Sequence, residues 1–259
     1  MFFFREIRKY WRFAVYAAKS DLQDEVANSY LNWIWWILEP LSSMLIYVLI
    51  FGIVFQNDEL YFPIFVFIGI TMWDYFNRCL TSSVNLIRNN QHIISRVYIP
   101  KYILLIQRML VLAFKMLICW AIVAGMMVIY KVPVGINLIY MIPDLAVFFV
   151  FCFACSLYFL HFGVYVNDLS RLLAIALNLM FYMTGIFFNI QKGFPAPFGY
   201  LFQRINPIAY LIFCLRKSLL YNETPSVIML GVWLIISLLL AAGGIWLVRK
   251  NENSYVKMI

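Results

Sequence analysis

Few residues in this sequence have the type and spacing of a catalytic site. The two histidines, His92 and His161, are isolated, and no H-E-x-x-H, G-x-S-x-G or D-x-[DN]-x-[DN]-G motif occurs. The sequence also contains no G-x-x-x-x-G-K-[ST] phosphate-binding loop, so we do not expect this chain to hydrolyse ATP by that means. For His161 the apolar surroundings favour a hydrogen-bonded packing role over catalysis.

The cysteines do not form a recognisable metal or disulfide pattern. Cys152 and Cys155 make a C-x-x-C pair, but they lie inside the apolar stretch 148–160 and no second ligand pair accompanies them. Five cysteines at irregular spacing do not resemble a disulfide framework. We interpret them as small buried hydrophobic side chains and predict no metal site and no cofactor in this chain.

Charged residues interrupt some of the otherwise apolar stretches. Asp74 and Arg78 stand four positions apart, so on a helix they share one face and can pair, and Lys115 lies in the next apolar stretch. Charges at membrane depth face the protein interior or a watery cavity, because contact with lipid costs several kcal/mol. The sequence leaves open whether this pairing is functional or purely structural.

Long apolar helices must position these groups. Hydrophobic residues make up 64% of the 259 residues and charged residues only 12%, whereas a soluble domain has roughly 25% charged residues. The apolar stretches run for about twenty residues without alternating, which favours an all-α integral membrane protein over a β-barrel. The net charge of +8 is scattered between these stretches, so nucleic-acid binding is not expected.

The chain is predicted to form a single transmembrane domain over residues 1–259, with six spans inside residues 33–248. The spans are expected at residues 33–55, 61–82, 103–129, 138–165, 172–189 and 226–248. No cleavable signal precedes them, because Met1–Phe4 is too short for an apolar core and lies before the first positive charges.

Both chain ends are predicted to be cytoplasmic. Residues 1–28 place Phe4, Ile7, Trp11, Ala14 and Ala18 on one face, as in a helix that lies in the membrane interface; a solvated basic tail is the alternative. With residues 1–28 and the tail 249–259 inside, twelve basic residues fall in cytoplasmic segments and five in outer ones. Lys and Arg are retained on the cytoplasmic side, so this orientation is favoured.

Two segments between the spans are neither simple loops nor simple spans. Residues 84–101 are polar and amphipathic, which predicts a short cytoplasmic helix against the membrane, and Pro100 suits the first turn of the helix that follows. Residues 190–225 are rich in aromatic and aliphatic side chains but broken by glycines and prolines. We predict that this segment forms short re-entrant helices in the outer leaflet.

Four blocks of the sequence match one family pattern in order. They are Ser29–Leu41 with Ile46, Tyr47, Phe51 and Gly52; Ser82–Ile87 with Ile93–Lys101; Tyr165–Leu169; and Asn206, Pro207, Tyr210 and Arg216. Together they resemble the permease subunit of type-two ABC exporters of polysaccharide, the O-antigen, capsule and teichoic-acid group. The chain departs from the family pattern at Val26, Ala27, Asn32 and Asn167. These departures leave the expected architecture unaffected, but Ala27 and Asn167 stand where the family often has Lys and Arg, so a phosphate contact through those two residues is not expected.

The resemblance implies a homodimer in the bacterial cytoplasmic membrane, bound to a cytoplasmic ATPase dimer that carries the ATP and Mg. It also implies export of a glycan on a polyprenyl diphosphate lipid. Residues expected to couple to the ATPase are Arg88, His92, Arg96, Tyr98, Pro100, Asp168 and Arg171; those at the lipid-diphosphate entrance are Arg5, Arg8, Arg12, Arg96 and Lys101.

Aromatic side chains are expected along the channel and at its outer gate. The channel set is Trp33, Trp35, Trp36, Tyr47 and Phe51, and the gate set is Phe194, Pro195, Phe198, Asn206, Pro207 and Tyr210. Membrane-interface anchoring is an equal explanation for Trp33 and Trp36.

Two other functions remain open. An integral membrane transferase acting on a lipid-linked sugar or acyl donor would need a base, for which Asp74, Asp144, His161 and Asp168 are the candidates. An ABC exporter of drugs or small lipids is the second alternative.

Overall fold

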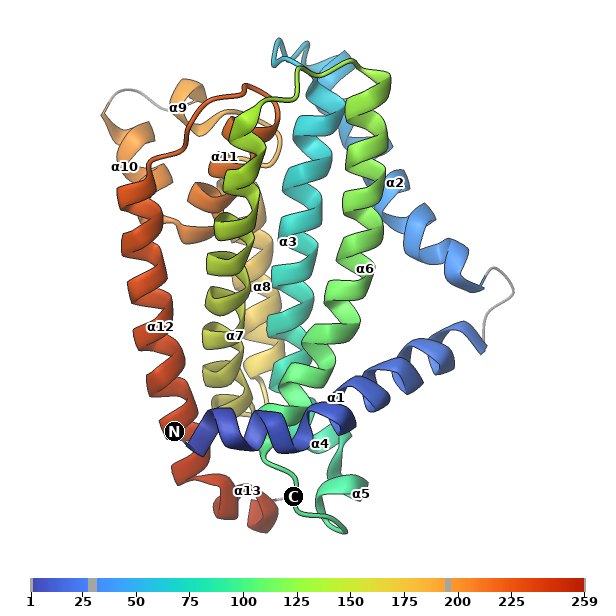
Figure 1. Ribbon diagram of the computed structural model, residues 1–259, viewed down its shortest axis with the longest axis vertical. Coiled ribbons are helices and arrows are strands. Elements are labelled where there is room, and N and C mark those ends of the chain that lie inside the picture. Colours follow the sequence, from blue (N-terminus) through green and yellow to red (C-terminus); the bar gives the residue numbers. More distant parts are fainter. Residues whose placement is uncertain (1, 28–31, 194–196, 259) are drawn as a thin grey trace.

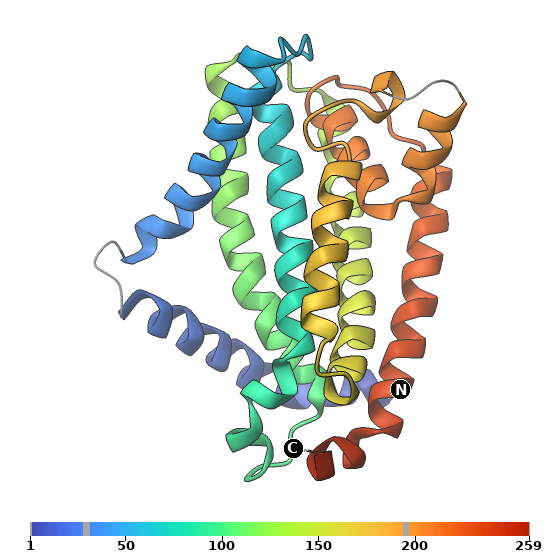
Figure 2. The same cartoon turned by 180° about the vertical axis from the view of Figure 1, so that it is seen from behind.

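The computed structural model describes residues 2–27, 32–193 and 197–258, and this part of the chain is helical without strands. The long helices stand side by side in one bundle, and the first and last described residues lie at the same end of it (Figures 1 and 2). We call this the termini end and the other the far end. The predicted all-α architecture is confirmed.

The bundle is built around α3 (Phe62–Val84). This helix packs against α6 (Lys101–Ile129), α7 (Met141–Tyr165), α8 (Leu169–Met183) and α2 (Trp35–Tyr47), which continues as the π-helix η2 (Val48–Val54). The outer helix α12 (Val227–Lys250) packs along α7. Most residues of α3 are buried, whereas the side chains of Asp74 and Arg78 remain 48% and 39% exposed.

Four of the six predicted spans are long and apolar enough to cross a membrane. These are Trp35–Val54, Lys101–Ile129, Val227–Lys250, and Ile136–Tyr165, in which the 3₁₀ helix η3 (Ile136–Tyr140) precedes α7. The other two predicted spans are also helices of the bundle, but α3 falls outside this group and α8 has only 15 residues. The number of six spans therefore stays a prediction.

Helix α1 (Phe2–Ala27) lies across the termini end instead of along the bundle (Figure 1). The small side chains of Ala14 and Ala18 are buried, and the helix packs against α6. Tyr102 donates a hydrogen bond to Glu6, and Gln107 donates one to Asp21 at 3.0 Å. The predicted amphipathic helix is thus present, and its buried small residues allow it to approach the bundle closely.

The polar segment after α3 forms two short helices, α4 (Leu86–Asn89) and α5 (Gln91–Ile94), instead of the single helix expected. They are separated at Asn90, whose side-chain amide donates to the carbonyl of Leu86 at 2.8 Å. Such local bonds compete with helix continuation. The segment lies at the termini end beside α13 (Glu252–Met258) (Figure 2).

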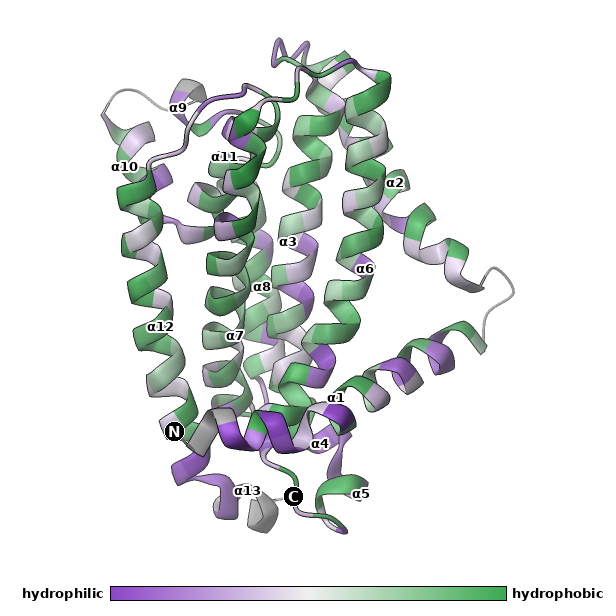
Figure 3. Cartoon of the chain, in the orientation of Figure 1, coloured by the Kyte–Doolittle hydropathy of each residue, from purple (hydrophilic) through white to green (hydrophobic). Residues whose placement is uncertain are grey.

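Three short helices cover the far end. They are α9 (Ile190–Gly193), α10 (Phe198–Ile205) and α11 (Pro207–Leu219). The hydropathy colouring in Figure 3 shows mostly apolar residues along the long helices and polar residues gathered on α1 and at the termini end. A few polar positions lie within the bundle itself, on α3 and α6 (Figure 3).

Candidate functional site

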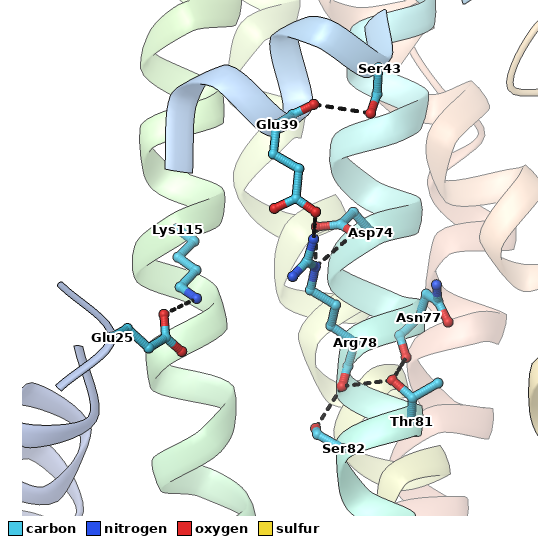
Figure 4. A network of polar contacts seen from close by, with 9 residues as sticks. All are labelled: Glu25, Glu39, Ser43, Asp74, Asn77, Arg78, Thr81, Ser82 and Lys115. Carbon is cyan, nitrogen blue, oxygen red and sulfur yellow. Dashed lines mark hydrogen bonds and ion pairs between the residues drawn. The ribbon is translucent and has the colours of Figure 1, made fainter. Parts of the chain in front are cut away.

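A cluster of opposite charges lies between α2, α3 and α6. Arg78 donates through Nε to both carboxylate oxygens of Asp74 at 2.8 Å, and its Nη2 lies 2.6 Å from Oε1 of Glu39 (Figure 4). The predicted pairing of Asp74 with Arg78 is therefore confirmed. The partner from α2, Glu39, was not foreseen, although a lone carboxylate among the apolar residues of the predicted span 33–55 is a signal of the same kind as Asp74.

A second group of charges attaches α1 to α6. Glu25 forms ion pairs with Lys115 and, at 3.6 Å, with Arg108. The Lys115 ammonium also lies 5.7 Å from the ring centroid of Trp36, which packs edge-on against Phe114. One pocket is lined by two carboxylates and two cations of these groups, Glu39, Asp74, Arg78 and Lys115. Together with Glu25 and Arg108, which lie outside its lining, these six charges pair with one another and connect four helices.

The predicted ATPase-coupling residues gather at the termini end. Arg88 of α4 donates to Oδ1 of Asn167 in the turn between α7 and α8, and the next residue, Asp168, lies 3.7 Å from Arg171 in an exposed pair. His92 and Arg96 are exposed, and Pro100 is buried where α6 begins. The fold thus brings residues 88 and 167 together, although the coupling role itself remains a prediction.

The C-terminal helix α13 holds this segment in place. Glu252 accepts a hydrogen bond from the Tyr98 hydroxyl at 3.1 Å and one from the Lys101 backbone N–H at 3.3 Å. Burial and the Glu252 carboxylate raise the pKa of Tyr98, so its hydroxyl stays protonated and able to donate. Sequence reasoning missed Glu252, since a lone acid in a tail carries no motif.

His161 and Tyr255 fasten the other side of α13. Nδ1 of His161 lies 2.7 Å from the hydroxyl of Tyr255, which is fully buried and packs near the ring of Tyr165. The predicted hydrogen-bonded packing role of His161 is confirmed.

The basic residues expected at the lipid-diphosphate entrance do not share one environment. Arg5, Arg8 and Arg12 are exposed along α1, and Arg96 is exposed after α5. Lys101, in contrast, is 2% exposed, and its ammonium contacts the carbonyl of Ile99 at 3.2 Å and Glu252 at 4.0 Å. Since its charge is already compensated inside the protein, Lys101 is not part of that exposed basic surface.

The aromatic residues assigned to the channel fall into two groups. Trp33 and Trp35 are exposed at the start of α2, and Trp36 borders the charged pocket. Tyr47 and Phe51 instead contact Phe187 in the turn after α8, with ring centroids 4.5 Å and 4.4 Å apart. Only this second group forms a compact aromatic cluster.

The residues assigned to the outer gate are partly explained by helix capping. The Asn206 side chain accepts hydrogen bonds from the N–H groups of Ile208 and Ala209, and Pro207 occupies the first position of α11. Tyr210 donates to the Ser226 carbonyl at 3.0 Å, and Phe198 is exposed. Phe194 and Pro195 lie outside the described residues.

Arg216 of α11 is buried between α3 and the turn that follows α8. Its guanidinium donates to the carbonyls of Phe65, Gly185 and Ile186 at 2.7 to 3.1 Å, and it is 5% exposed. Phe65 belongs to the first turns of α3, and Gly185 and Ile186 lie in the turn after α8. Arg216 thus fixes this turn against α3 and places a positive charge near the C-terminal end of α8.

The candidate bases of a transferase do not converge. Asp74 is paired with Arg78, and Asp168 is exposed with Arg171. Asp144 begins α7 and His161 ends it, so at 1.5 Å per residue they lie about 25 Å apart. In the part of the chain that is described, no group of His, Cys, Asp and Glu could hold a metal ion.

Curated relatives of the chain are exporter components. Two O-antigen export system permease proteins, both named RfbA and from Klebsiella pneumoniae, are each 22% identical to it over 246 residues, which cover 95% of this chain and 94% of theirs. A protein of the same name from Myxococcus xanthus is 27% identical over 100 residues, 39% of this chain. No family model matches. The predicted resemblance to polysaccharide-exporter permeases is confirmed along nearly the whole chain.

Proposed function

We propose that this chain is the permease subunit of an ATP-driven exporter that moves a polysaccharide linked to polyprenyl diphosphate across the bacterial cytoplasmic membrane. The observation that carries the proposal is the full-length similarity to O-antigen export permeases, on a bundle with four helices able to span a membrane. A separate ATPase would supply the energy, and both termini would be cytoplasmic.

The termini end supports contact with a protein partner. Beyond the long helices, Ile93, Val97 and Tyr98 expose apolar surface in the same short segment as the exposed polar residues His92 and Arg96. Apolar groups surrounded by polar ones are typical of protein–protein contact surfaces. In the proposed orientation this surface would face the cytoplasmic ATPase.

Force applied there would reach the bundle by short connections. The bond from Arg88 to Asn167 links α4 to the turn that begins α8, and the contacts of Glu252 link residues 98–101 to the end of α12. Movement of the segment would therefore displace α8 and α12.

A homodimer is proposed through α2 and α8. Helix α8 exposes a stripe of Leu172, Ile175, Leu179 and Tyr182, which recur every three or four residues. Helix α2 exposes apolar residues on the same side of the molecule (Figure 2). Pairing these faces would place the aromatic cluster of Tyr47, Phe51 and Phe187 near the subunit boundary.

Affinity purification of the tagged chain from its native membrane tests the proposal. We expect an ABC ATPase to co-purify in equal amount and surface glycan to be lost when the chain is deleted. Arg96→Glu should weaken ATPase association, whereas Lys131→Glu, at the far end, should not. A chain that purifies without an ATPase, and whose deletion leaves surface glycan intact, would refute the function.

A further inference from the structure

A second pocket, at the far end, has a composition different from the charged cluster. It measures about 690 Å³ and is lined by residues of α9, α10, α11 and the first turn of α12, and of the segments before α3, after α8 and after α11. We call it the far-end pocket. Its lining includes Asn189, Gln191, Tyr200, Gln203, Tyr210 and Tyr221. No role assigned above uses its amide groups.

The amides are built into the wall. Gln203 is 4% exposed, and its Oε1 accepts from Nε2 of Gln191 at 2.7 Å, which orients the amide. An amide carries two donors in addition to its oxygen, and a buried amide costs free energy unless those groups find partners. Asn189, whose Oδ1 accepts from the Gln191 N–H at 3.1 Å, also lines the pocket. The wall thus offers oriented amide donors to a polar ligand.

The phenols are fixed by bonds at the edge of the pocket. The Tyr210 hydroxyl donates to the Ser226 carbonyl, and the Tyr221 hydroxyl donates to Oε2 of Glu59 at 2.9 Å. Burial and Glu59 raise the pKa of Tyr221, which keeps this hydroxyl neutral. Tyr200 is half exposed at the opening of the pocket. Its ring supplies an apolar face beside the polar groups.

The charges of the far-end pocket cancel. Two acids, Glu59 and Glu223, stand with two bases, Arg204 and Lys217, and Lys217 pairs with Glu223 at 3.2 Å. An anionic headgroup therefore gains no net attraction. A third pocket, between α6 and α7, has a lining that is apolar apart from Lys131 and suits hydrocarbon instead.

We propose that the far-end pocket binds a neutral, hydroxyl-rich ligand, namely a sugar unit of the exported glycan. Sugar hydroxyls both donate and accept, which matches paired amides and phenols, and the C–H face of a sugar ring can lie on Tyr200. The assignment rests on the proposed function for the identity of the glycan and for the outward direction of this end.

Saturation-transfer NMR on the purified full chain, in a detergent without sugar, tests the binding. The probes are glucose, galactose, mannose and N-acetylglucosamine, each at about 10 mM, because a weak sugar site has Kd near 1 mM. Phosphoethanolamine serves as the headgroup probe. At least one sugar should give signals from its ring protons, and phosphoethanolamine should not displace it.

Two variants connect the signal to this pocket. Tyr200→Ala should weaken binding about 5-fold, because it removes a ring face, and Gln203→Leu should weaken it by at least as much. Tyr130→Ala, an equally exposed tyrosine at the far end outside the pocket, should bind as the wild type does. Since Gln203 is buried, Tyr200→Ala decides the result if Gln203→Leu does not fold.

Three outcomes overturn the inference: no sugar signal, equal signals in all variants, or displacement by phosphoethanolamine. None of them affects the ATPase co-purification, which tests the permease function separately. Conversely, loss of the ATPase partner with retained sugar binding would overturn the permease function while leaving a sugar site.

Discussion

Removing the Arg216 guanidinium should destabilise the far end of the bundle strongly. Three backbone carbonyls, those of Phe65, Gly185 and Ile186, receive its four hydrogen bonds, and the side chain is buried. A hydrogen bond to a charged group contributes about 1.5–3 kcal/mol, but burying the charge opposes this, so we expect a net cost of about 3–5 kcal/mol for Arg216→Ala.

The cost should appear in thermal unfolding of the purified protein in detergent. For a chain of this size 1 kcal/mol shifts the melting temperature by about 2–4 °C, so Arg216→Ala should melt about 10 °C below the wild type. Arg216→Lys should recover only part of this, because one ammonium cannot reach carbonyls on two separate segments with the geometry of a guanidinium.

Arg171→Ala is the matched control, since Arg171 is 85% exposed and its pair with Asp168 contributes little. If Arg216→Ala melted within about 2 °C of the wild type, the Arg216 hydrogen bonds would contribute less than about 1 kcal/mol, and the argument that they stabilise the far end would be refuted.

Three further variants test particular contacts. Gly163→Ala should destabilise by about 1–3 kcal/mol, because a Cβ there would run into the backbone of Val84, whereas Gly125→Ala, with open space, should be neutral or stabilising in the same melts. Asn206→Ala should cost about 1 kcal/mol as a lost N-cap, and Asn206→Asp should retain most of the stability; equal melting of both would contradict this. Glu252→Gln should speed amide hydrogen exchange across residues 91–101, measured by mass spectrometry, while the exposed Asn253→Ala should not.

The long helices could be predicted from the sequence, because a helix that crosses a bilayer needs about twenty consecutive apolar residues. Stretches of about twenty apolar residues can satisfy their backbone groups only as helices, so the all-α architecture and the positions of the long segments follow from composition and run length. The same reasoning separated residues 84–101 and 190–225, which the structure places at opposite ends of the bundle. The break at Asn90 was not predictable, because it depends on one side-chain bond.

The family resemblance identified the segments that contain the predicted site residues. It did not predict correctly which of these residues are exposed. Lys101 stands in a matching block and carries a charge, yet the fold buries it against Glu252, 151 positions away. Asn206 and Pro207 match the family motif, and in the structure they form the N-terminal cap and first residue of α11.

Most ion-pair partners are determined by the tertiary structure. The pair Asp74–Arg78 follows from helical spacing alone, since four positions make one turn. Glu39, Glu25 and Glu252 find their partners on other helices, and no local pattern encodes such contacts. Arg216 shows the same limit: its sequence neighbours are those of an ordinary helix end, and only the packing of α11 against α3 and the turn after α8 buries its charge among backbone carbonyls.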